Sequence, residues 1–108
     1  MKNYIRALKN YGKETVQVIK KDIRYKNLIK TGDLLGSIDF RLVERGDNIE
    51  IEFIMISYGK YVDEGTIYIR AREFFKENIK SQFEKWTPEF NKAIDTDINE
   101  ELNSLFKK

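Results

Sequence analysis

The chain has 108 residues and a formal net charge of +2, and it contains neither cysteine nor histidine. The lack of cysteine excludes disulfides, thiolate nucleophiles and thiolate metal sites, and the lack of histidine excludes the commonest general base and the commonest transition-metal ligand. We therefore expect one domain over residues 1–108, with no cofactor and no metal. No apolar run approaches the roughly 18 residues of a membrane span, and the N-terminal residues lack the apolar segment of a secretion signal, so we expect no membrane association.

Positive charge is concentrated at the N-terminus. Residues 1–30 carry nine Lys and Arg against Glu14 and Asp22, which gives +7, whereas residues 31–108 carry eleven against sixteen acids, which gives −5. A basic segment can bind nucleic acid, or it can face acidic surfaces of its own chain or of a neighbouring subunit. No aromatic or glycine-rich nucleic-acid motif accompanies the charge, which favours the second interpretation. If the segment binds nucleic acid, the contacts would be made by Lys9, Lys13, Lys20, Lys21, Arg24 and Lys26.

The first segment predicts an amphipathic helix from about Asn3 to about Tyr25. Its non-polar positions recur at spacings of three or four, while lysines and arginines occupy the rest of the surface. Glycine inside a helix costs up to about 1 kcal/mol relative to alanine, so Gly12 indicates close packing or a bend. The positions of the apolar face are Ile5, Leu8, Gly12, Val16, Ile19 and Ile23.

A β-hairpin is predicted over residues 38–57. The segment Thr31–Ser37 has two glycines and reads as a turn before it. Apolar and polar residues then alternate from Ile38, as in a half-buried strand, and Arg45–Asn48 supplies the residue types of a hairpin turn. The return strand begins at Ile49.

The return strand changes character along its length. Its first half places Glu50 and Glu52 on one face, which predicts a charged edge or a face of salt bridges. In its second half Ile54, Met55 and Ile56 make both faces apolar. A strand that is apolar on both faces is covered on both faces, either by the chain's own helices or by a neighbouring subunit.

The residues after the hairpin are rich in tyrosine. We expect Tyr58–Glu64 to form a short helical turn that Gly65 ends, and Thr66–Arg70 to form a short strand. Tyrosines are favoured at protein interfaces because a rigid ring loses little entropy on binding; the alternative is that these rings cover the sheet. They are Tyr58, Tyr61 and Tyr68.

The C-terminal part predicts a long amphipathic helix that is kinked or broken near Pro88. Apolar residues recur at spacings of three or four on both sides of this proline, which is typical of a core or partner-facing seam. They are Phe75, Ile79, Phe83, Trp86, Phe90, Ile94, Ile98, Leu102 and Leu105. With the N-terminal helix and the hairpin, this helix gives an α+β fold.

No catalytic constellation is visible. Asp63 and Glu64 are adjacent, so on a helical turn they point about 100° apart and cannot act as a facing pair. The serines have no histidine to activate them, and no phosphate-binding glycine loop occurs. We therefore do not expect an enzyme.

Three patterns, in order, resemble the tail-completion or head–tail joining proteins of long-tailed phages. The first is Thr31-Gly32-Asp33-Leu34-Leu35-Gly36-Ser37-Ile38, which matches the family's Thr-Gly-x-Leu-x-x-Ser-Ile. The second is Tyr61-Val62-Asp63-Glu64-Gly65-Thr66, which matches a tyrosine-rich turn ending in acid-x-Gly-Thr. The third is Ala71-Arg72-Glu73-Phe74, where the family has Ala-x-Pro-Phe, so that Glu73 departs from the pattern.

The resemblance implies a virion structural protein, present in the host cytoplasm during assembly. It implies a cyclic homo-oligomer, commonly a hexamer, which completes the tail and contacts the head connector and tail-tube proteins; nucleic acid would meet it only as the passing genome. We expect the subunit contact at the end of the second strand and the turn after it. The candidate interface residues are Ile54, Ile56, Tyr58, Tyr61, Val62, Gly65, Thr66 and Tyr68. The alternative function is a small basic nucleic-acid-binding or regulatory module.

Overall fold

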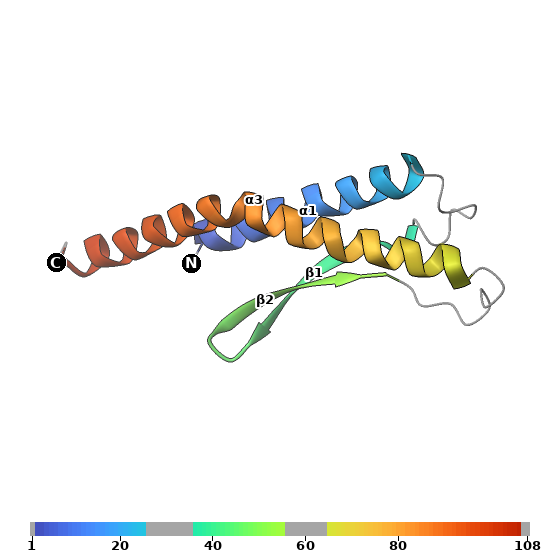
Figure 1. Ribbon diagram of the computed structural model, residues 1–108. Helices are drawn as coiled ribbons and strands as arrows, with labels where there is room; N and C mark the ends of the chain where they lie inside the picture. The colour runs from blue at the N-terminus through green and yellow to red at the C-terminus, as the bar shows by residue number, and fades with distance from the viewer. Residues whose placement is uncertain (1, 26–35, 56–64, 107–108) are drawn as a thin grey trace.

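The computed structural model describes residues 2–25, 36–55 and 65–106, and these form two helices and one hairpin. Helix α1 spans Lys2–Tyr25, strands β1 and β2 span Asp39–Arg45 and Asn48–Ile54, and helix α3 spans Gly65–Phe106. The helices run side by side in opposite directions, and the hairpin lies along one side of the pair (Figure 1). The predicted α+β fold is confirmed.

Helix α1 buries one face, as its sequence pattern predicts. Leu8, Tyr11 and Ile19 are buried, whereas Lys9 and Lys13 are exposed. Gly12 is buried within this face, and a Cβ atom added there would lie 2.5–2.7 Å from ring carbons of Phe40. Of the two interpretations of Gly12, the structure therefore supports close packing: the missing side chain lets the ring of β1 lie against the helix backbone.

The hairpin has the predicted turn and faces. β1 and β2 pair antiparallel, with Phe40 opposite Phe53 and Leu42 opposite Ile51. Gly46 has φ 61°, a left-handed angle that two-residue hairpin turns require at their first position and that glycine adopts without strain. The turn thus sets a register in which the apolar residues of both strands share the face that packs on the helices.

The core consists of two clusters between the helices and the inner face of the hairpin. One is built around Val16, Ile19 and Ile38, and the other around Ala7, Leu8, Tyr11 and Phe90. Tyr11 meets Phe53 and Phe90 edge to face, with ring centroids 5.4 Å apart in each pair, and its hydroxyl donates to the Ile79 carbonyl oxygen at 3.2 Å. Burial raises the pKa of Tyr11 to about 12. This tyrosine therefore joins α1, β2 and α3.

Helix α3 begins earlier than its sequence suggests. The predicted strand over Thr66–Arg70 is wrong, because the structure has these residues in the first turns of α3. Gly65 begins the helix instead of ending a turn. A five-residue alternation is too short to distinguish a strand from a helix, and a helix already formed gains one hydrogen bond for each residue that it adds.

Pro88 lies inside α3 and does not interrupt it. Of the two alternatives, a kink or a break, the structure has the continuous helix, which bends along its length (Figure 1). Proline removes one backbone N–H and its ring crowds the carbonyl one turn earlier. The carbonyl that loses its N–H partner is that of Glu84, and next to it the Thr87 hydroxyl donates to the Phe83 carbonyl oxygen at 2.8 Å.

The molecule is elongated. Its principal extents are 65 × 25 × 17 Å and its radius of gyration is 17.7 Å, whereas a compact domain of this length has about 13 Å. The C-terminal turns of α3 extend past the N-terminal end of α1 (Figure 1). In the part of the chain that the structure describes, no helix is long and apolar enough to cross a membrane.

Candidate functional site

The end of the molecule where α1 begins and α3 continues is held by one carboxylate. The side chain of Asp97 on α3 accepts hydrogen bonds from the backbone N–H groups of Asn3 and Tyr4, each at 2.9 Å, and from the Asn3 side chain at 3.0 Å. The first N–H groups of a helix have no partner inside it, and negative charge is favoured there. Asp97 thus caps α1 from the other helix. Burial raises its pKa, but these hydrogen bonds outweigh burial and hold the pKa below the usual 3.8.

A second polar contact fixes the same helix pair farther along. Glu14 accepts a hydrogen bond from the indole N–H of Trp86, and it forms an ion pair with Lys85 at 3.0 Å. The bonds from Lys85 and Trp86 lower the pKa of Glu14 below 4.5. Asp22 also faces α3, where the Asn78 amide donates to it at 3.2 Å. Both acids of α1 are therefore engaged with α3.

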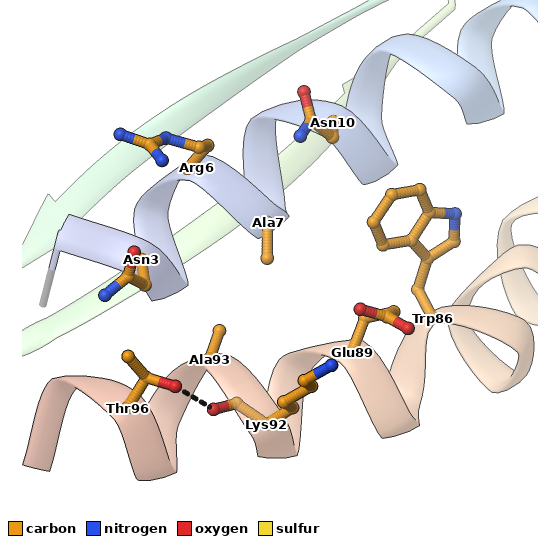
Figure 2. Close-up of a pocket in the computed structure, with 9 residues that line it drawn as sticks. All are labelled: Asn3, Arg6, Ala7, Asn10, Trp86, Glu89, Lys92, Ala93 and Thr96. Carbon is orange, nitrogen blue, oxygen red and sulfur yellow. Dashed lines mark hydrogen bonds between the residues drawn. The ribbon is translucent and has the colours of Figure 1, made fainter. Parts of the chain in front are cut away.

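Between these contacts the helices leave a shallow groove of about 240 Å³ (Figure 2). Ala7 of α1 and Ala93 of α3 face each other across it, and their small side chains leave the hollow open, while Trp86 stands at one end. Arg6, Glu89 and Lys92 are among the groups at its edge. Such a lining can accept a side chain of a partner protein, but it contains no nucleophile paired with a base.

The C-terminal end of α3 presents an uncovered apolar stripe. Ile98, Leu102 and Leu105 follow one another at spacings of four and three, so they lie along one side of the helix. They are 46%, 44% and 66% exposed. We call residues 98–106 the overhang, because α1 begins opposite Asp97; the Asn3 amide still donates to Glu100 within it, at 3.3 Å. The seam that the sequence predicts along α3 is thus covered unevenly: Phe90 is buried, Phe83 in its middle is 51% exposed, and the last three residues are open.

The exposed side of α1 carries a stripe of cations. Basic residues recur at helical spacing on the side of α1 away from the core. Because both acids of this helix face α3, no carboxylate of α1 offsets their charge. Near the N-terminal end, Lys2, Arg6 and Lys9 surround the half-buried Ile5 and line a hollow of about 490 Å³. We call this the basic hollow. The stripe consists of Lys2, Arg6, Lys9, Lys13 and Lys20.

The outer face of the hairpin combines ion pairs with two apolar residues, Val43 and Ile54. Glu52 binds Arg41 at 2.7 Å and Arg45 at 3.0 Å, so the predicted face of salt bridges is present. Hydrogen bonds from Arg41 and Arg45 lower the pKa of Glu52. On this face Ile54 remains 37% exposed. The described helices pack on the inner face alone, which leaves the outer side of Ile54 open.

The other sequence candidates are placed as follows. Ile38 is buried at 1% exposure in the core, which gives this residue of the first motif a packing role, and Ser37 precedes it in a helical turn. Thr66, Tyr68, Ala71 and Phe74 lie in the helical backbone of α3. Arg24, from the predicted nucleic-acid set, lies in the backbone of α1, and the structure does not describe its side chain. The remaining candidates lie outside the described residues: Lys26, Thr31, Gly32, Leu34, Ile56, Tyr58, Tyr61, Val62 and Asp63.

The structure adds two features to the sequence candidates, the overhang and the basic hollow. Periodicity indicates the stripe through Leu105 but not where its cover ends. That limit depends on the pairing of Asn3 with Asp97, which are 94 positions apart. Within the described residues, no group of three or more acidic side chains could hold a metal ion.

In comparisons with known proteins, no family model, no curated protein and no solved structure matches the chain.

Proposed function

We propose that the protein is a structural subunit of a phage virion, which assembles with copies of itself into a ring that completes the tail and meets the head connector. The observation that carries self-assembly is the overhang, whose apolar stripe is open in the single chain. The phage setting rests on the resemblance over Thr31–Phe75. The role requires no catalysis, cofactor or metal.

Surface area supports an assembling subunit. The chain exposes 7,817 Å², whereas a compact monomer of 12.9 kDa exposes about 6,300 Å². The excess of about 1,500 Å² belongs to the elongated shape, and it leaves room for two faces of about 800 Å² each, the area that a standard protein interface takes from one partner. A ring subunit needs two such faces, one for each neighbour.

Three measurements test this function. We expect oligomers that grow with concentration in light scattering, ring-shaped particles in electron micrographs, and the protein in purified virions encoded by the same genome. A Leu102→Ser, Leu105→Ser variant should remain monomeric with little change in thermal unfolding, since both side chains are largely exposed. A matched control is Asn99→Ser, Asn103→Ser, on exposed positions of the same turns. Absence of the protein from purified virions would contradict the phage role.

A second candidate function follows from the cation stripe on α1. Five basic residues on one side of a helix can track the phosphates of a duplex. This function predicts DNA binding whose affinity falls steeply with salt and is weakened by Lys9→Glu with Lys13→Glu. No measurable binding at about 50 mM salt would exclude it.

A further inference from the structure

The overhang combines its apolar stripe with negative charge. Between Ala93 and Phe106 the sequence has four acidic residues and no basic one. One of them, Asp97, caps α1, while Asp95 and Glu101 are exposed. By helical spacing, Asp95 lies on one side of the stripe and Glu101 on the other. The overhang and the turn before it therefore form an apolar ridge with one exposed acid on each side, Asp95 and Glu101, and Lys107 and Lys108 follow in the sequence.

The basic hollow has the opposite character. Its apolar floor is Ile5, and its edges are Lys2, Arg6 and Lys9. No salt bridge joins these three cations to a carboxylate anywhere in residues 2–25, 36–55 and 65–106. An apolar residue among cations complements an apolar ridge flanked by acids in charge and in polarity.

We propose that the overhang of one copy docks into the basic hollow of another, and that this contact, made by the end of the molecule where α1 begins, links subunits of the assembly. The inference rests on the self-assembly proposed above and names the surfaces that form its contact. Ile98 and Leu102 pack on Ile5, while the acids beside the stripe pair with the cations of the hollow. The partner is a second copy because the same chain carries both complementary surfaces and exposes an excess area that leaves room for two interfaces.

Within one chain the contact cannot form. The overhang runs beyond the end of α1 and away from it, since the helices are antiparallel and meet at Asp97 (Figure 1). The basic hollow lies on α1 itself, and α3 continues past the first turn of α1 in the direction away from this hollow. The two surfaces can therefore be joined only between chains.

Charge reversal on each surface tests the contact. The first variant is Arg6→Glu with Lys9→Glu, and the second is Asp95→Lys with Glu101→Lys. Each should raise the concentration for half-assembly at least ~10-fold in sedimentation velocity, because like charges then face each other. An equimolar mixture of the two should assemble again, since every acidic surface then meets a basic one.

Matched controls keep the same charge changes away from the two surfaces. They are Lys13→Glu with Lys21→Glu on α1, and Glu77→Lys with Glu84→Lys on α3, all exposed. These should assemble as the wild type does. Circular dichroism of each variant verifies that the helices are retained.

The outcomes separate this contact from the proposed function. If the wild-type chain assembles and both charge reversals leave assembly unchanged, the contact is wrong. A mixture of the two variants that does not assemble also overturns it. Neither result contradicts the proposal that the protein is a ring subunit. The contact alone is likewise overturned if only the first variant is affected and it loses duplex DNA binding, which identifies α1 as a nucleic-acid surface. Wild-type chain that stays monomeric at every concentration overturns the contact, and absence from purified virions overturns the function.

Discussion

At the scale of single residues, Asp97 of α3 closes the N-terminal end of α1 through three hydrogen bonds. A helix is usually capped by a residue directly before its first turn. Here the cap comes from the other helix, so one carboxylate both completes α1 and sets how the two helices are aligned. That alignment determines how much of the apolar stripe of α3 is covered.

Protonation of Asp97 should weaken the fold at low pH. Its pKa is lowered in the folded chain, so its contribution to stability is complete above the unfolded value near 3.8 and is lost as the pH falls through the folded value. We expect Asp97→Asn to lower the midpoint of thermal unfolding at pH 7, with the difference from wild type narrowing below about pH 4. Thermal scans between pH 2 and 7 measure this. Glu84→Gln, exposed on the same helix and away from the proposed contact, is the control, and an equal effect of both changes would contradict the cap.

Gly12 should resist substitution even by the best helix former. Alanine favours a helix over glycine by about 1 kcal/mol, but its Cβ would lie 2.5 Å from the Phe40 ring. We expect Gly12→Ala to lower the free energy of unfolding by about 1–3 kcal/mol, as overpacking does. Urea denaturation measures it. Gly36→Ala is the control, because nothing lies within 4 Å of the added atom. A more stable Gly12→Ala variant would show that the ring moves aside at no cost.

At the scale of elements, the bend in α3 has an identifiable source in Pro88. Proline inside a helix costs about 3 kcal/mol relative to alanine. We expect Pro88→Ala to raise the free energy of unfolding by about 1–3 kcal/mol and to increase the helical signal in circular dichroism. Glu89→Ala, at the next exposed position, should change stability by less than about 0.5 kcal/mol. A loss of stability in Pro88→Ala would show that Trp86 and Phe90 need the bend to reach α1.

How far the sequence predicts each element depends on how local its determinants are. The hairpin follows from Gly46 and from the alternation around Phe40 and Phe53, all within a few positions, and the pattern of α1 is equally local. The error over Thr66–Arg70 arises because that segment takes the conformation of the long helix which it joins. The exposed state of Leu102 also depends on tertiary structure, because α1 packs on the side of α3 that carries Asp97, and Leu102 lies about 140° around the helix from that residue. Local patterns cannot contain that information.

At the scale of the whole molecule, the elongated shape limits the core to the region where the helices and the hairpin overlap. The buried apolar side chains lie where α1, α3 and the hairpin overlap, and the overhang adds length without adding to the core. Stability of the single chain should therefore be nearly independent of the overhang. Assembly, in contrast, should depend on it.

Solution scattering can test this shape. We expect the monomeric Asp95→Lys, Glu101→Lys variant to have a radius of gyration near the 17.7 Å of the structure, rather than the roughly 13 Å of a compact domain. Small-angle X-ray scattering in a dilution series measures it. A matched sample of Glu77→Lys with Glu84→Lys should give larger values that fall on dilution. A compact monomer would contradict the extended overhang.

The cap on α1 also bears on the order in which the chain acquires its structure. The N–H groups of Asn3 and Tyr4 are bonded to a residue 93 to 94 positions later, and synthesis proceeds at about 5–20 residues per second. For several seconds the first helix therefore leaves the ribosome without its cap and without α3 to cover its apolar face. This segment carries seven basic residues against two acidic ones, so like charge opposes contact between copies of it during that interval.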